Sequence, residues 1–185
     1  PELGHFALIL ALAVALTQGV LPLIGAHCNR LAWIAIARPA AQTTALFITI
    51  SFGCLVWAFV NNDFSVVYVA QHSNTLLPME YRVAAVWGGH EGSLLLWVLM
   101  LGWWTFAVSL LSRQLPDAMV ARVLGVLGLV TAGFLLFILI TSSPFERLLP
   151  GAAEGRDLNP LLQDPGLVIH PPLLYMGYVG FSIAY

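Results

Sequence analysis

The densest group of chemically useful residues is the string WGGHEG at residues 87–92. His90 and Glu91 form a titratable pair, and the paired glycines allow a tight backbone turn or a close approach to a flat ligand. The string therefore predicts a ligand site or a proton site. The alternative, which the residues alone slightly favour, is an interfacial turn in which Trp87 anchors to lipid headgroups and Glu91 caps the next helix.

A second candidate is His170, which stands directly before Pro171 and Pro172. Because proline is preorganised for the first turn of a helix, we expect His170 beside the N-terminal end of an apolar helix. There the helix dipole disfavours the imidazolium ion, and a neutral imidazole can coordinate a metal. One histidine does not make a metal site, however, and the residues alone favour a histidine that merely caps the helix.

A site that holds a metal ion through several protein ligands is a weaker hypothesis. The available side chains are His72, His90, Glu91 and His170. No close spacing between them enforces their convergence on one ion. The residues alone therefore do not favour such a site.

Aromatic side chains form a stripe on one predicted helix. Trp97, Met100 and Trp104 are spaced i, i+3 and i+7, which is one helical face. At about 1.5 Å per residue, Trp104 lies about 15 Å from the start of the apolar run. A tryptophan at that depth does not anchor to headgroups, so the stripe either lines a cofactor such as haem or quinone or packs against another helix. Helix packing is the commoner explanation, and we favour it.

Membrane-spanning helices must position these side chains. Hydrophobic residues make up 59% of the 185 residues and charged residues 9%, against roughly 25% charged in soluble domains. Apolar runs predict four complete spans and the start of a fifth, near residues 6–26, 44–60, 93–111, 119–140 and 170–185. The expected fold is an all-α, polytopic membrane helix bundle. Since the last run is still apolar at Tyr185, we expect residues 1–185 to be the N-terminal part of one multi-span membrane domain.

The charges predict the orientation of the spans. The short loops are flanked by Arg30, Arg38, Arg113 and Arg122, whereas the long loops, residues 61–92 and 141–169, hold most of the acids. Because arginine collects on the cytoplasmic side, we expect the N-terminus and both long loops to face outward. Seven arginines, no lysine and a formal net charge of −2 leave no basic surface for nucleic acid.

Local patterns add four further expectations. Residues 64–70 favour a strand, and Pro78 favours the start of a short interfacial helix. Pro22, inside the first span, predicts a kink or an early end of that helix. Both long loops exceed the commonest connections in bundles, of about 2 to 8 residues, which predicts a built structure on the outer face.

Three longer strings carry a resemblance to a known family. They are WGGHEGSLLLW at residues 87–97, GRDLNPLLQDP at residues 155–165 and HPPLLYMGY at residues 170–178. The chain resembles the N-terminal part of the CcmF/CycK family of cytochrome c-type biogenesis proteins, the membrane component of bacterial haem lyase. The resemblance runs essentially end to end, including residues 62–64 and 81–84.

This resemblance implies a function in cytochrome c maturation. It implies that the protein receives haem from the periplasmic haem chaperone CcmE and takes part in its covalent attachment to apocytochrome c. It further implies the bacterial inner membrane, haem b as cofactor, and CcmH and CcmG as thiol-reducing partners. Whether this component is itself the enzyme that forms the thioether bond stays open.

The family pattern also implies a role for one residue. His170 matches the first of two periplasmic histidines that ligate the iron of the delivered haem, and its partner is expected beyond Tyr185. His90, Trp87, Trp97 and Trp104 are further candidates for haem contact, although the resemblance gives His90 no defined chemical role. The implied mechanism is positioning of the haem more than catalysis by side chains.

Two alternatives remain open. A paralogous haem lyase could use the same scaffold for a specialised cytochrome c nitrite reductase, and only the cytochrome that is matured distinguishes the two. A multi-span transporter or respiratory-chain subunit is less favoured, because transporters usually place ionisable residues near the bilayer midplane. The predicted spans contain little more than Gln18 and hydroxyl groups there.

Overall fold

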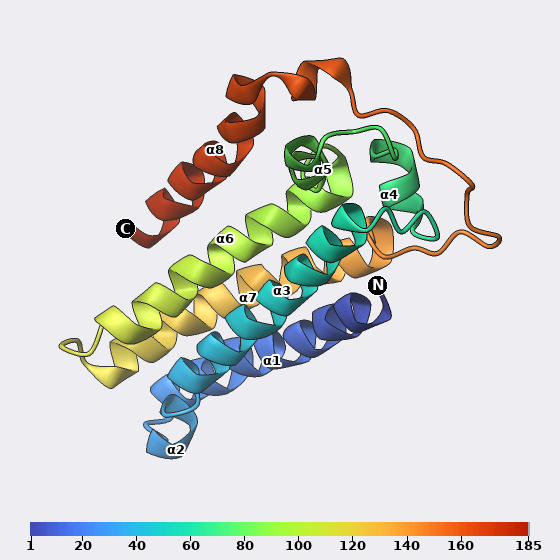
Figure 1. Cartoon of the computed structure of the whole chain (residues 1–185). Coiled ribbons are helices and arrows are strands. Elements are labelled where there is room, and N and C mark those ends of the chain that lie inside the picture. Colours follow the sequence, from blue (N-terminus) through green and yellow to red (C-terminus); the bar gives the residue numbers. More distant parts are fainter. Residues whose placement is uncertain (185) are drawn as a thin grey trace.

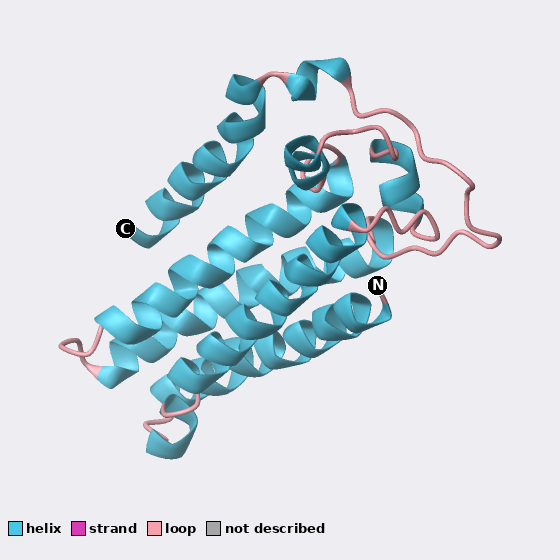
Figure 2. Ribbon diagram, viewed as in Figure 1, coloured by secondary structure: helices cyan, strands magenta, loops and turns pink. Residues whose placement is uncertain are grey.

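The computed structural model describes residues 1–184, and the regular elements of this part are helical (Figure 2). They are α1 (Glu2–His27), α2 (Leu31–Ile34), α3 (Ala37–Val60), α4 (Val67–His72), α5 (Met79–Ala85), α6 (His90–Leu111), α7 (Asp117–Thr141), the 3-10 helix η1 (Pro160–Gln163) and α8 (Pro165–Ala184). Among residues 1–184, four segments are long and apolar enough to cross a membrane: Glu2–His27, Leu31–Val60, His90–Leu111 and Asp117–Thr141. The expected all-α, multi-span fold is confirmed.

The helices α1, α3, α6 and α7 form an antiparallel bundle, and α8 packs outside it along α6 (Figure 1). We call the end where α1 and α6 begin the long-loop end, because it carries residues 61–89 and 142–164. The opposite end, with residues 28–36 and 112–116, is the short-loop end. Since α8 also begins at the long-loop end, it runs parallel to α6.

Small residues bring α1 and α7 close together. Ala121, Gly125, Gly128 and Ala132 are all buried on one face of α7. A Cβ added to Gly128 would lie 2.9 Å from the backbone nitrogen of Gly19 in α1. Close approach through small residues is a common way for helices to associate in membranes, where burial of apolar surface supplies no driving force.

Each of the first four predicted spans lies within one long helix, and these helices begin before the predicted spans. α3 begins at Ala37 and not near residue 44, because Pro39 falls in its first turn, where a missing N–H removes no helical hydrogen bond. α1 continues through Pro22 to His27, so the predicted early end is wrong. α6 likewise begins at His90 and takes in the last residues of the predicted loop.

The start of α8 is a further correction. The helix begins at Pro165, five residues before the predicted span, and Tyr185, the last residue of that span, lies outside the described residues. Oδ1 of Asp164 accepts hydrogen bonds from the backbone N–H groups of Gly166 (2.8 Å) and Leu167 (3.2 Å), which is an N-cap followed by proline. His170 therefore lies in the second turn and not beside the N-terminal end, so the expected effect of the helix dipole, confined to the first turn, does not apply.

The two long loops pair with each other over the long-loop end. The N–H groups of Val67, Leu148 and Arg156 donate to the carbonyls of Glu146, Ser65 and Ala70, at 2.9, 2.8 and 2.8 Å respectively. Only an isolated bridge joins Val66 to Arg147 within the described residues, and α4 follows at once, so the strand predicted for residues 64–70 is wrong. The short helix expected after Pro78 is confirmed as α5.

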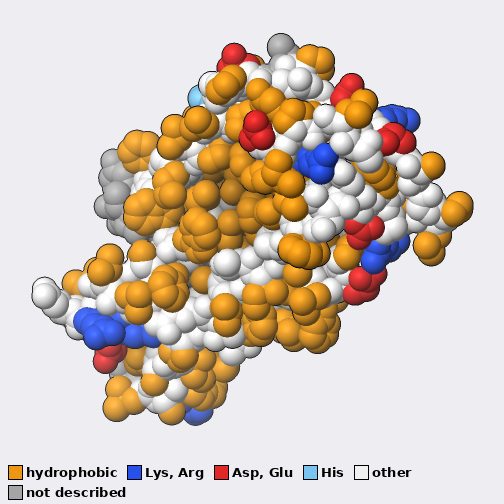
Figure 3. Space-filling model, viewed as in Figure 1, with side chains coloured by type: hydrophobic (Ala, Val, Ile, Leu, Met, Phe, Trp, Pro, Cys, Tyr) orange, Lys and Arg blue, Asp and Glu red, His pale blue; other side chains and the backbone are white. Residues whose placement is uncertain are grey.

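Charged side chains lie toward the two ends of the bundle, and hydrophobic side chains cover much of the flank between them (Figure 3). At the short-loop end, Arg38 donates to the carbonyl of Ser112 at 3.0 Å and so satisfies the C-terminus of α6. At the long-loop end, Arg147 pairs with Glu2 and lies 3.5 Å from the carboxylate of Asp63. This distribution suits a bundle that is immersed in a bilayer.

Candidate haem-contact site at the start of α8

The turn at residues 86–89 is held by Tyr68 of α4. The buried Tyr68 hydroxyl accepts a hydrogen bond from the N–H of Gly89 (2.9 Å) and donates to the carbonyl of Val86 (3.1 Å). Burial raises the pKa of Tyr68 well above its usual value, and the negative charge of Glu91 raises it further. Because the phenol stays protonated, it remains a hydrogen-bond donor throughout the physiological range.

The glycines of this turn allow the chain to approach itself closely. A Cβ on Gly89 would lie 2.6 Å from Nε2 of His72, and one on Gly92 would lie 1.7 Å from the carbonyl oxygen of Val86. The space in front of these glycines is thus filled by this chain. They serve close packing within the turn and not the approach of a flat ligand.

His90 and Glu91 form the first turn of α6. The His90 side chain is exposed, and its ring centroid lies 6.4 Å from that of Phe137 on α7. The half-buried Glu91 carboxylate is at the N-terminal end of the helix, where the helix dipole stabilises negative charge. Across the described part of the chain, no three His, Cys, Asp or Glu side chains are grouped to hold a metal ion.

Trp87 joins this turn to α8. Its indole Nε1–H donates to the carbonyl of Val168 at 3.0 Å. Pro172, four residues after Val168, has no N–H, so it cannot supply the usual helical hydrogen bond to that carbonyl. Trp87 provides the missing donor. Its indole N–H is therefore engaged by the protein and does not serve as the predicted headgroup anchor.

The aromatic stripe of α6 also contacts α8. The Trp97 ring stacks on Tyr175 with a centroid separation of 6.0 Å and lies 4.9 Å from the ring of Phe134 on α7. Nε1 of Trp104 donates to the carbonyl of Met176 at 3.2 Å. The interpretation of the stripe as a packing surface is confirmed, and contact of these tryptophans with a cofactor stays a prediction.

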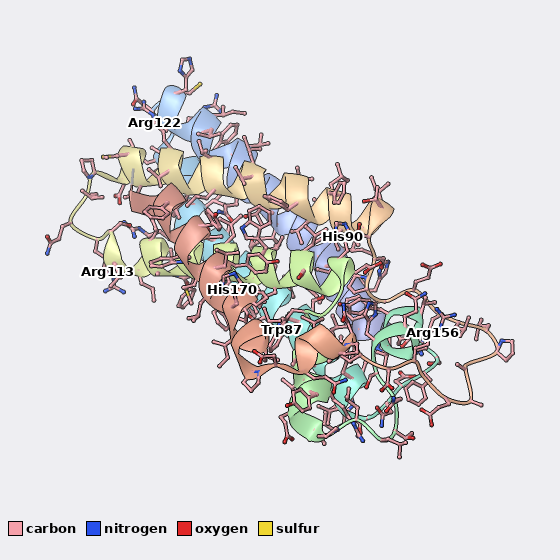
Figure 4. All side chains as sticks on the ribbon, turned by 90° about the horizontal axis from the view of Figure 1, so that it is seen from above. Trp87, His90, Arg113, Arg122, Arg156 and His170 are labelled. Atoms are coloured by element: carbon pink, nitrogen blue, oxygen red, sulfur yellow. The ribbon has the colours of Figure 1, made fainter. Side chains whose placement is uncertain are left out.

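His170 lies on α8 (Figure 4), and its side chain is exposed. Residues three or four positions apart on a helix are neighbours. At these spacings from His170, Leu167, Leu173 and Leu174 are 43%, 66% and 38% exposed. A Cβ on Gly177, one step further along this face, would meet no atom within 4 Å. An accessible imidazole among accessible leucines suits a flat apolar ligand with a central metal ion.

Of the candidates named from the sequence, Trp87 bonds to Val168, two residues before His170 on α8, whereas His90 faces the ring of Phe137 on α7. Sequence analysis missed Tyr68, whose only signal is that a buried tyrosine hydroxyl needs a partner. Its partner N–H lies 21 residues further along the chain, at a distance that no local pattern reveals.

The segment from this turn onward, residues 87–185, matches a protein-family model described as "Cytochrome C assembly protein". The chain belongs to the cytochrome c assembly protein family. The matched segment begins at Trp87 and contains α6, α7, the second long loop and α8. Both ends of the hydrogen bond between Trp87 and Val168 are therefore within the region that defines the family.

Relatives named "Cytochrome c-type biogenesis protein CcmF" match this family member over its whole length. CcmF of Pseudomonas aeruginosa is 62% identical and CcmF of Escherichia coli is 58% identical, each over 186 residues and 100% of this chain. NrfE of Haemophilus influenzae, also a cytochrome c-type biogenesis protein, is 47% identical over 183 residues and 99% of this chain. The chain spans 28% of CcmF of Pseudomonas aeruginosa and 29% each of CcmF of Escherichia coli and of NrfE.

A solved structure, "Cytochrome c Heme Lyase CcmF", has the same arrangement of helices. It superposes with a TM-score of 0.83 and 28% sequence identity, over 98% of this chain and 28% of that one. The resemblance to the CcmF family that the three strings carry is confirmed.

Proposed function

We propose that this chain is part of a haem lyase component that acts in cytochrome c maturation. In this proposal the whole protein receives haem b from the haem chaperone CcmE, attaches it to apocytochrome c, and works with the thiol-reducing proteins CcmH and CcmG. The family model, the relatives named cytochrome c-type biogenesis proteins and the heme lyase fold support the assignment.

The observation that carries the proposal is the position of His170. Its exposed imidazole lies in the second turn of α8, between the exposed leucines on the same face. Neutral imidazole is a common axial ligand of haem iron, and leucine side chains suit contact with the apolar macrocycle. We assign His170 as one axial ligand of the haem substrate, with the second ligand supplied from outside this chain.

The proposed orientation places this histidine at the periplasmic face of the bacterial inner membrane. Arg113 and Arg122 lie at the opposite end of the molecule from Arg156 in Figure 4, and Arg30 and Arg38 belong to the same short-loop end. An excess of arginine next to short loops marks the cytoplasmic side. The long-loop end, with His170, then faces the compartment of CcmE and apocytochrome c.

In this proposal, the residues of this chain act by positioning the haem. Addition of a cysteine thiol across a haem vinyl group forms one carbon–sulfur bond and moves the thiol proton to the other vinyl carbon, so the bond-forming step needs no other reactant. His170 would fix the iron, and the neighbouring leucines would exclude water from one face of the ring. Holding two reactants together in this way can supply about 7–11 kcal/mol of a reaction barrier.

The test is His170→Ala in the full-length protein. We expect at least a tenfold loss of haem captured from the chaperone and no holocytochrome c, because the iron loses a ligand. His5→Ala is the matched control, since His5 is a half-buried histidine at the same end but on α1. Both variants are compared at equal amounts of protein in the membrane. Normal cytochrome c formation by His170→Ala would overturn the proposal.

The match to NrfE favours a second candidate, a haem lyase for a specialised cytochrome c nitrite reductase. CcmF of Pseudomonas aeruginosa is the more similar protein, at 62% against 47% identity. Expression in strains that lack one or the other lyase, followed by haem staining of their cytochromes, separates the two. We expect rescue of the general cytochromes c, and rescue of the nitrite reductase alone would favour the second candidate.

A further inference from the structure

We propose that Trp87 is a positioning residue for His170, acting through the Val168 carbonyl that Pro172 leaves without its helical partner. This inference rests on the proposed function and deepens it. It assigns separate tasks to two neighbouring features: His170 contacts the haem, while Trp87 and Pro172 hold the turn of α8 that carries His170.

The hydrogen bond between Trp87 and α8 is specific. Nε1 of Trp87 has one hydrogen to donate, and the Val168 carbonyl oxygen lies 3.0 Å away. Both residues are half-buried. Without Trp87 the carbonyl would lose this partner, and without the carbonyl the indole N–H would lose its acceptor, so each group stabilises the position of the other.

The spacing of Val168 and His170 explains how this bond presents the imidazole. Successive residues of an α-helix are about 100° apart, so the side chains of Val168 and His170, two positions apart, point in directions that differ by about 200°. Val168 therefore faces the bundle when His170 faces away from it. Fixing the Val168 side of the turn sets the rotation of α8 about its axis, and with it the direction of His170.

Trp87 is itself held on both sides. The Tyr68 hydroxyl donates to the carbonyl of Val86 and accepts from the N–H of Gly89. Val86 directly precedes Trp87, and Gly89 follows it by two residues. Oγ of Ser93 donates to the Trp87 carbonyl at 3.0 Å. The backbone of Trp87 is therefore fixed, and the indole N–H is held in position to bond to the Val168 carbonyl.

Within the described residues, two hydrogen bonds join α6 to later turns of α8. Tyr175 donates to Oγ of Ser93 at 3.2 Å, and Trp104 donates to the carbonyl of Met176. These bonds lie five and six residues after His170, so they fix the later turns of α8. Of these three hydrogen bonds, the bond from Trp87 lies nearest to His170.

The experiment measures haem binding and the electron paramagnetic resonance spectrum of the full-length protein with Trp87→Phe, which keeps an aromatic ring but removes the donor. We expect about fivefold weaker binding, the equivalent of one hydrogen bond of about 1 kcal/mol. We also expect a broadened low-spin haem signal, because the imidazole is no longer held in one direction. A residue that only stabilises the fold would lower the amount of protein and leave the signal of each haem unchanged.

Pro172→Ala tests the same bond without altering Trp87. Residue 172 then has an N–H that competes for the Val168 carbonyl. We therefore expect haem binding to weaken, but by less than in Trp87→Phe. The double variant is expected to bind haem no worse than Trp87→Phe, since both changes act on one bond. Pro171→Ala is the matched control, because its new N–H meets the carbonyl of Leu167 and should leave binding unchanged.

The outcomes separate this inference from the proposed function. Wild-type binding and spectrum in Trp87→Phe, or fully additive effects of the two changes, would overturn the positioning role while His170→Ala still abolished binding. If His170→Ala itself left haem binding intact, the assignment of the ligand would fail first. If Trp87→Phe fails to accumulate, Pro172→Ala against Pro171→Ala decides, and equal binding by the two overturns the inference.

Discussion

Gly92 and Gly133 are both glycines within long helices, yet they have different surroundings. A Cβ on Gly92 would lie 1.7 Å from the carbonyl oxygen of Val86, whereas a Cβ on Gly133 would meet nothing within 4 Å. We expect Gly92→Ala to lower the free energy of unfolding by about 2–4 kcal/mol, because the turn before α6 must move. We expect Gly133→Ala to be neutral or to stabilise by up to about 1 kcal/mol.

Thermal unfolding of the two purified full-length variants measures this difference. The matched pair controls for the general effect of adding a methyl group to a helical glycine. Equal melting temperatures would show that the turn at residues 86–89 tolerates expansion, which would also weaken the case for a rigidly held Trp87.

At the scale of elements, the two long loops are joined by Glu154 and Thr75. Oε1 of Glu154 accepts from the Thr75 N–H at 3.1 Å, and Oε2 accepts from the Thr75 hydroxyl at 2.7 Å. The Thr75 hydroxyl, the Gly155 N–H and the Thr75 N–H lower the pKa of Glu154 below its ordinary value of 4.5. A lowered folded-state pKa means that this stabilisation is present above about pH 4.5 and is lost as the pH falls through the folded value.

Hydrogen exchange at the Thr75 amide tests this pairing. At neutral pH, we expect less protection of the Thr75 amide in Glu154→Gln than in the wild type. The glutamine side chain has one oxygen in place of the two carboxylate oxygens that accept these bonds, so it cannot accept both of them in the same geometry. As the pH falls through the folded-state pKa of Glu154, which lies below 4.5, the two proteins are expected to converge. A difference in protection that does not shrink as the pH is lowered through acid unfolding would mean that the Glu154 carboxylate does not hold the loops together.

The elements also show which features the sequence can predict. Long apolar runs locate the long helices but not their first residues, because the bilayer demands about 20 apolar residues and a helix can continue beyond them. The start of α8 was predictable in principle from Asp164 and Pro165. The pair Pro171 and Pro172 instead led to an expected start at residue 170, five residues too late. The strand prediction near Val66 is wrong because a single bridge to Arg147, 81 residues away, is the extent of the pairing among the described residues and α4 begins at Val67.

The candidate site was predictable only in part. The role predicted for His170, as a ligand of haem iron, came from the resemblance to the family. The stripe through Trp97 and Trp104 predicted a packing surface. The bond from Trp87 to Val168 joins residues 81 positions apart. Such a contact follows from the packing of α8 on α6, which no local pattern reveals.

At the scale of the whole molecule, the chain is an apolar bundle with its charges toward two ends and one extra helix on its flank. The long-loop end gathers the paired loops, the turn at residues 86–89 and the first turns of α8. The chain spans 28% and 29% of the CcmF proteins of Pseudomonas aeruginosa and Escherichia coli, and in the proposed function the second haem ligand comes from the rest of the whole protein. The structural contribution of this part is a fixed helix that carries one exposed histidine.

The most direct measurement is the reduction potential and axial-ligand spectrum of haem bound to the purified full-length protein with His170→Met. Replacing an imidazole ligand by a thioether raises the potential of haem iron. We predict a higher potential and a changed low-spin spectrum in His170→Met, with neither change in His90→Met. A potential and spectrum identical to those of the wild type would contradict the assignment of His170 as a haem ligand.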